Sequence, residues 1–144
     1  MPGIFNNETF RHLIISTALV LSFSSIRAAV NQVELNDQVV DSLIRCAQYK
    51  KAIKMIETRT QSATDKRKIA FLLLQQSQVF LKQGWENQAG RAISEASGIV
   101  VSLRNPGYRL RFYLALQKAR HAGYLWNQEE YHRWLNQAGS ILKS

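Results

Sequence analysis

The clearest chemical signal in this 144-residue chain is a run of arginines interleaved with aromatic residues, from Arg104 to Tyr113. It reads RNPGYRLRFY, so its guanidinium groups stand beside Tyr108, Phe112 and Tyr113. Arginine next to an aromatic ring suits cation–π contacts, stacking on nucleic-acid bases or binding of anionic lipid headgroups. The same run could instead begin a helix, with its arginines in solvent and its rings inside. The sequence leaves both interpretations open.

Residue patterns that would indicate an enzyme are weak. His121 and His132 lie on either side of a predicted turn, and the sequence offers no third ligand at metal-binding spacing. Glu129 and Glu130 are adjacent on a predicted helix, so their side chains diverge and do not make a paired-carboxylate site. Neither a glycine-rich phosphate loop nor a nucleophile motif is found. We therefore expect no enzymatic activity, no metal site and no cofactor.

The single cysteine, Cys46, excludes an intramolecular disulfide. It follows the apolar residues Val40, Leu43 and Ile44 at helical spacing. A buried structural thiol is therefore expected.

The chain is basic, with 19 Lys and Arg against 10 Asp and Glu and a net charge of +9. Such a surface attracts polyanions, including anionic lipid headgroups, acidic proteins and nucleic acid. Alternatively, the excess charge only keeps a small protein soluble.

The start of the chain has the layout of a secretory signal. Arg11 and His12 precede an apolar run at 13–26, and the small residues Ala28 and Ala29 follow it. The run is short for a membrane-spanning helix, which needs about 20 residues. We predict a signal peptide at 1–28 and a mature domain at 29–144, in the periplasm or secreted. An uncleaved anchor or an ordinary amphipathic helix is the alternative, and export would make nucleic acid an unlikely partner.

From residue 33 onward, apolar residues recur at helical spacing and no alternating strand pattern is seen, which predicts an all-α fold. We expect helices near 69–81, 108–121 and 128–142, with a polar separator at 58–65. Thr64 or Asp65 can cap the first of these, and Asn127 with Glu130 resembles a capping box on the last.

Residues 82–96 form the most regular segment. A helix is expected to end at Lys82, and Gly84 supplies the permissive backbone of a tight bend. The next helix carries Ala89, Ile93 and Ala96 on one stripe. The two alanines allow another helix to approach closely, so these residues and Gly84 are predicted to be structural.

On these residues the chain resembles the tetratricopeptide-repeat (TPR) family, whose repeat is two antiparallel helices. Residues 70–103 match best; units at 33–66 and 112–144 match more weakly. The weaker matches rest on Leu43, Tyr49, Ala52, Ile56, Ala119, Leu135 and Ala138, while Tyr131 occupies a position that is normally small. Equivalent residues at 52, 89 and 131 are 37 and 42 apart, which predicts insertions at 61–64 and 105–107. The resemblance implies about three stacked, divergent TPR-like hairpins.

In that family the first helices line a concave surface that binds peptides. Carried over by position, this implies a groove that grades from acidic, through apolar, to basic and aromatic. Its residues would be Glu34, Asp37, Asp41 and Arg45, then Phe71, Leu74, Gln78, Leu81 and Lys82, then Tyr113, Leu116, Arg120 and Tyr124. The alternative is that Phe71, Leu74 and Leu81 are core, sealed by a terminal helix or by homodimerisation.

Together these features predict an exported TPR-like adaptor or chaperone that binds a protein or peptide partner, as an accessory factor of a secretion system or pilus. One alternative is an intracellular, basic regulatory or nucleic-acid-binding helical protein. Another is a helical protein that uses its arginine–aromatic run on an anionic membrane surface.

Overall fold

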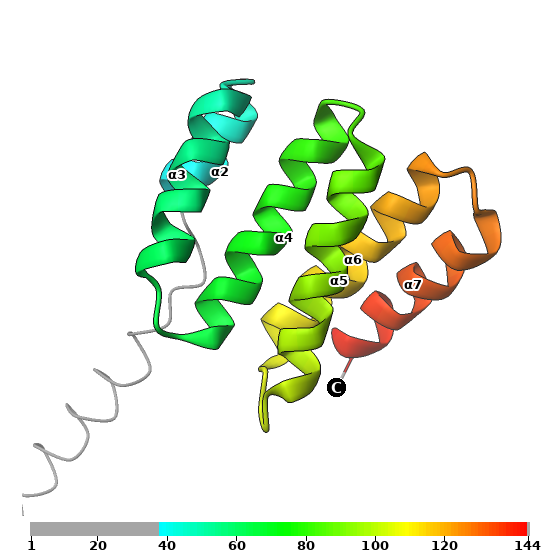
Figure 1. The fold of residues 1–144 in the computed structure, drawn as a ribbon. Coiled ribbons are helices and arrows are strands. Elements are labelled where there is room, and N and C mark those ends of the chain that lie inside the picture. The colour runs from blue at the N-terminus through cyan, green and yellow to red at the C-terminus, as the bar shows by residue number, and fades with distance from the viewer. Residues whose placement is uncertain (1–37, 144) are drawn as a thin grey trace, which may run out of the picture. The chain divides into compact units, whose positions relative to one another are not determined.

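A computed structural model describes residues 38–143, which form six α-helices and no strand, as the all-α prediction requires (Figure 1). The predicted signal at 1–28, together with Glu34 and Asp37, lies outside the described residues. Within the described part, none of the helices has the length and apolar character needed to span a membrane. The helices are α2 (Gln38–Arg45), α3 (Tyr49–Ser62), α4 (Lys66–Lys82), α5 (Glu86–Ser102), α6 (Tyr108–Tyr124) and α7 (Gln128–Ile141).

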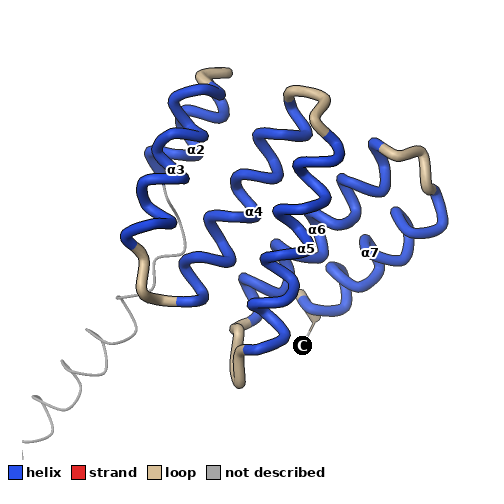
Figure 2. Tube along the Cα trace, viewed as in Figure 1, coloured by secondary structure: helices blue, strands red, loops and turns tan. Residues whose placement is uncertain are grey.

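The helices form three antiparallel hairpins, α2–α3, α4–α5 and α6–α7, which stack in chain order (Figures 1 and 2). The first helix of each hairpin contacts the first helix of the next, since α4 touches both α2 and α6. The second helix also contacts the first helix of the next hairpin, as α3 does with α4 and α5 with α6. The first helices therefore lie side by side across the stack.

The bends of the three hairpins repeat one hydrogen-bond pattern. Each places one residue in the left-handed region, with φ of 55° at Ala47, 72° at Gly84 and 57° at Trp126. The N–H of that residue donates to the carbonyl three residues earlier, at 3.1 to 3.2 Å. The N–H of the following residue donates to the carbonyl five residues earlier, at 2.9 Å in every bend. The predicted bend at Gly84 is confirmed, and the left-handed residues are 37 and 42 apart, the same spacings as residues 52, 89 and 131.

Local signals set most helix ends. The Asp65 carboxylate accepts the Arg67 N–H at 2.8 Å, and the Asn127 side chain accepts the Glu130 N–H at 3.1 Å, so both residues are caps. The Glu130 carboxylate accepts a bond from Arg133 at 2.7 Å, so the predicted capping box is confirmed only in its Asn127 half. The predicted polar separator at 58–65 holds the connection between α3 and α4, but α3 continues into it as far as Ser62. The hydroxyls of Thr58 and Thr60 donate to carbonyls one turn earlier, at 2.9 and 2.8 Å, and so satisfy themselves within the helix.

Two apolar clusters form the core. One joins α4, α5 and α6, and the other joins α2 and α3 to the opposite side of α4. Ala89 and Ala96 have no exposed surface and Ile93 is 5% exposed, as expected for structural residues. The buried members are Ala70, Leu73, Leu74, Ile93, Ala96, Val100, Leu110 and Leu114 in the first cluster, and Val40, Ile44, Ala52, Ile56, Leu72 and Val79 in the second.

Tyr131 fits a normally small position because the residue facing it is a glycine. A Cβ placed on Gly123 of α6 would lie 3.3 Å from the Tyr131 ring. In the middle hairpin, 42 residues earlier, the equivalent positions hold Leu81 and Ala89, both buried. The large side chain thus comes from the first helix of the middle hairpin and from the second helix of the last hairpin.

The buried thiol expected at Cys46 is wrong. The cysteine is exposed and unbridged. Helix α2 ends at Arg45, so Cys46 stands in the bend and not on the buried stripe of Val40 and Ile44.

Candidate functional site

A groove of about 450 Å³ crosses the stack over the first helices of the hairpins. Every residue that lines it comes from α2, α4 or α6 and none from a second helix, as the family resemblance implies. The lining residues are Asp41 of α2, Phe71 and Gln78 of α4, and Tyr108, Arg109, Phe112, Tyr113 and Arg120 of α6.

The wall between α4 and α6 is held by an aromatic pair. The Phe71 and Tyr113 rings lie 5.1 Å apart between centroids, tilted by 32°. The Tyr113 hydroxyl donates to Oε1 of Gln78 at 2.8 Å, which ties α6 to α4. Burial raises the pKa of the Tyr113 phenol, and the charge of Asp41 raises it further. The phenol is therefore neutral at physiological pH.

Asp41 is positioned by a residue that the sequence did not single out. Gln75 of α4 is fully buried, and its Nε2 donates to Oδ1 of Asp41 at 2.9 Å. This bond joins α2 to α4 and fixes a carboxylate at one side of the groove. A charge-assisted bond of this kind is stronger than one between neutral groups.

The charges follow the expected order in the described residues. Asp41 stands at the α2 side, Phe71 lies in the middle, and Arg109 and Arg120 stand at the α6 side. Arg109 also lies over the Tyr108 ring, 5.9 Å from its centroid, and its Nε donates to the Tyr108 hydroxyl at 3.1 Å. The arginine–aromatic run and the predicted groove are thus one site.

Two leucines that the resemblance placed in the groove are core residues. Leu74 has no exposed surface and Leu81 is 3% exposed. Leu74 packs in the cluster that joins α4 to α5 and α6, so it cannot touch a partner at the surface. The alternative that these side chains belong to the core is correct for both, whereas Phe71 is only half-buried and remains accessible.

Three further candidates do not line the groove. Lys82 is the last residue of α4 and is exposed at the bend. Arg45 ends α2 in the same way, and Leu116 is half-buried on α6 without reaching the groove. The prediction that Lys82 lines the groove is therefore wrong, and this residue serves below as a control position.

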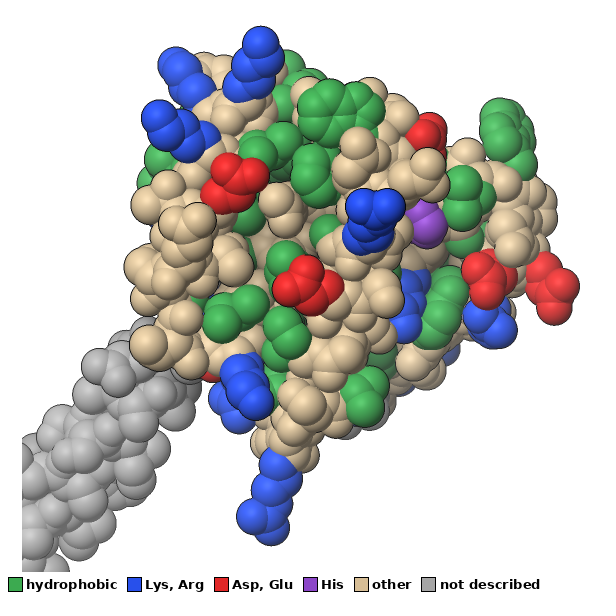
Figure 3. Space-filling model, viewed as in Figure 1, with side chains coloured by type: hydrophobic (Ala, Val, Ile, Leu, Met, Phe, Trp, Pro, Cys, Tyr) green, Lys and Arg blue, Asp and Glu red, His purple; other side chains and the backbone are tan. Residues whose placement is uncertain are grey.

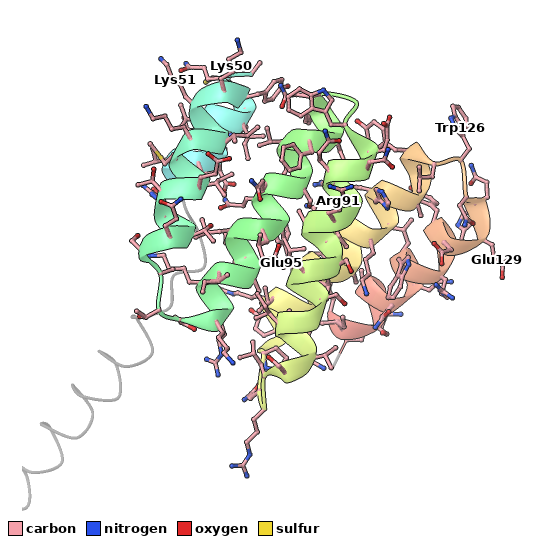
Figure 4. All side chains as sticks on the ribbon, viewed as in Figure 1. Lys50, Lys51, Arg91, Glu95, Trp126 and Glu129 are labelled. Atoms are coloured by element: carbon pink, nitrogen blue, oxygen red, sulfur yellow. The ribbon has the colours of Figure 1, made fainter. Side chains whose placement is uncertain are left out.

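Tyr124 belongs to a second hollow that continues from the groove. Arg120 lines both, and the second hollow adds Gly123, Tyr124 and Trp126 within about 360 Å³. Trp126 is 84% exposed and projects from the α6–α7 bend (Figure 4). The sequence could have shown this residue through the 42-residue spacing, which aligns it with Gly84.

The aromatic residues at the end of the chain separate into two pairs. Tyr131 and Trp134 are half-buried within the last hairpin, and Nζ of Lys118 lies 4.3 Å from the Trp134 ring centroid. Nζ of Lys118 also donates to the Ser97 hydroxyl at 3.1 Å, and burial lowers the pKa of that ammonium. Tyr124, by contrast, is 47% exposed beside Trp126.

Among residues 38–143, no three His, Cys, Asp or Glu side chains are grouped so as to hold a metal ion. Comparison with protein-family models, with curated proteins and with solved structures gives no match to this chain.

Proposed function

We propose that this chain is a protein-binding adaptor of TPR-like architecture, which holds a segment of a partner in the groove over α2, α4 and α6. The observation that carries the proposal is the origin of the lining residues, all of which lie on first helices. The hairpin stacking and the repeated bends support the same architecture. Binding relies on shape and charge, and we propose no catalytic step and no cofactor.

The groove suits an amphipathic segment. Phe71, Phe112 and Tyr113 offer apolar contact in the middle, where one or two large apolar side chains of the partner would anchor. Asp41 lies on one side and the arginines of α6 on the other. They would orient a segment that has a basic residue at the end near α2 and an acidic residue at the end near α6. Because the groove crosses α2, α4 and α6, the bound segment would lie across these helices, with its charged residues toward α2 and α6.

We further propose that the adaptor acts after export, as a chaperone or accessory factor of a surface assembly such as a secretion apparatus or pilus. The support is the signal-like layout of residues 1–28. Determining the N-terminal residue of the protein purified from its native cells tests this. A start near Ala29 is expected, whereas a chain that keeps Met1 in the soluble cell fraction contradicts export.

The groove is tested by a pair of charge reversals. Arg120→Glu changes a groove residue, and Lys82→Glu makes the same change in charge outside the groove. The tagged full-length protein is used to capture its partner from native cells, the partner is identified by mass spectrometry, and its Kd is then measured for each variant. We expect Arg120→Glu to weaken binding at least ten-fold and Lys82→Glu less than three-fold.

Equal effects of the two reversals would contradict the groove assignment. Helical circular dichroism and thermal unfolding check the fold of both variants, since both substituted side chains are exposed. A partner whose Kd is unaffected by Arg120→Glu binds elsewhere on the molecule.

A further inference from the structure

The end of the stack opposite the three bends carries a concentration of positive charge. There the loops between α3 and α4 and between α5 and α6 lie together, with the starts of α4 and α6 (Figures 1 and 2). In Figure 3, Lys and Arg side chains project from this lower end, and others gather at the upper left of the molecule. The "basic edge" consists of Lys66, Arg67, Lys68, Arg104, Arg109 and Arg111.

The charges of the basic edge are not balanced locally. Neither α4 nor α6 has an acidic residue in its first turn, although helix starts favour acidic side chains. Two carboxylates of the described residues stand near these cations: Asp65, which caps α4, and Asp41, which lines the groove together with Arg109. Within the described part of the chain, none of the six cations forms an ion pair. Among the described residues, the six cations therefore outnumber the carboxylates beside them, and the start of α6, which has no side-chain cap, adds its own positive potential.

Exposed apolar side chains stand at the same end. Val101, at the end of α5, is 82% exposed, and Leu142, just after α7, is 62% exposed. Tyr108, at the start of α6, is 53% exposed. A nucleic-acid backbone gains little from valine or leucine, whereas a lipid bilayer accepts both, and tyrosine favours its interface.

We propose that the basic edge docks the protein on an anionic phospholipid bilayer. Its cations lie against the lipid phosphates while Val101, Tyr108 and Leu142 enter the interfacial region. The groove opens onto this edge through Tyr108 and Arg109, so docking would bring a captured segment to the membrane surface. Docking and partner capture share Tyr108 and Arg109, but they can be tested separately, because Arg120 lies in the groove alone and Lys66 and Arg104 lie in the edge alone.

The test uses the full chain and flotation with two kinds of vesicle, one of pure phosphatidylcholine and one containing 30% phosphatidylglycerol (an amount chosen as roughly that of an anionic membrane). The wild type should bind the anionic vesicles at least ten-fold more tightly, with the preference falling as salt rises. Lys66→Glu/Arg104→Glu should remove most of that preference. The control is Lys50→Glu/Lys51→Glu, which changes the charge equally at the opposite end (Figure 4) and should reduce binding less than three-fold.

Two results would overturn the proposal. One is equal binding to both vesicles, or equal loss from the two double reversals. The other is binding that Val101→Ser/Leu142→Ser leaves unchanged and that single-stranded RNA abolishes in competition, which would assign the edge to nucleic acid. Bilayer docking requires that Val101→Ser/Leu142→Ser weakens binding to the anionic vesicles several-fold. The same variant should not change the affinity for RNA, which should be weaker than the affinity for the vesicles.

Discussion

The middle and last hairpins share one bend geometry and differ in what surrounds it. Buried residues run along both α4 and α5, whereas α7 has one buried residue, Ala138. Helix α7 contacts only α6 among the described helices, while α4 contacts four others. The bend of the middle hairpin holds Gly84; that of the last holds Trp126, which is 84% exposed.

This difference indicates a division of roles along the stack. The middle hairpin is enclosed, so its positions are fixed by packing and its Ala89 and Ala96 must stay small. The last hairpin is covered on one side only, and it tolerates an exchange of sizes at Gly123 and Tyr131. Its exposed positions carry the aromatic residues Tyr124 and Trp126 beside the groove, and these could be changed without disturbing the core.

The exchange of sizes gives the largest expected effect. Tyr131→Ala empties the space that the ring fills beside Gly123, and should lower the free energy of unfolding by about 2 to 3 kcal/mol. Adding Gly123→Leu gives the residue sizes of the middle hairpin, where buried Leu81 and Ala89 hold the equivalent positions. The double variant should recover at least about 1 kcal/mol of the loss. Chemical denaturation of the wild type, both single variants and the double variant measures this coupling.

The control for this cycle is Gly123→Leu alone, which should also destabilise the protein because the ring already stands 3.3 Å from the Cβ position. If the losses of unfolding free energy simply add in the double variant, positions 123 and 131 are not packed as positions 81 and 89 are. The two hairpins would then be alike only in their bends.

Much of the fold follows from short-range signals that the sequence displays. Asp65, Gly84 and Asn127 each act on neighbouring backbone groups, so their roles could be predicted without knowing the tertiary structure. Groove residues such as Phe71 and Arg120 required the register of the hairpins, which the family resemblance supplied. These predictions used spacing alone.

The errors arose where spacing does not determine exposure. Leu74 lies on the same helix as Phe71, but α4 is covered by neighbours on several sides, and only contacts with α5 and α6 show that Leu74 is core. Cys46 was predicted to be buried because the sequence has no glycine or proline after Arg45 to indicate that α2 ends there. Trp126 was missed as a left-handed residue because glycine is the residue expected there.

A smaller effect is expected from substitutions at the left-handed positions of the middle and last hairpins. Trp126→Gly relieves the backbone strain of a bulky residue at φ of 57° and should stabilise the fold by about 1 kcal/mol. Gly84→Ala, at φ of 72°, should destabilise it by a similar amount, although nothing lies within 4 Å of the added Cβ. Thermal unfolding of the two variants measures both shifts.

Partner binding separates the roles of the same two positions. Trp126→Gly should weaken capture of the partner although the protein is more stable, because the indole extends the groove beyond Arg120. Gly84→Ala should leave the Kd within about two-fold, as expected of a structural residue. If the more stable Trp126→Gly variant binds as tightly as the wild type, the exposed indole has no part in recognition.

The smallest effect concerns the bond that closes the middle hairpin against the last. Tyr113→Phe removes the hydrogen bond to Gln78 and should cost about 0.5 to 1 kcal/mol at neutral pH. Because burial raises the pKa of Tyr113 in the folded protein, the unfolded chain ionises first, near pH 10, and the wild type loses stability as the pH rises further. Phenylalanine cannot ionise, so the advantage of the wild type over Tyr113→Phe should shrink above about pH 10. Urea denaturation of both proteins from pH 7 to 11 follows this difference, in which the shared titration of lysines cancels. A constant difference would mean that Tyr113 ionises as readily folded as unfolded, and that the wall between α4 and α6 is open to water.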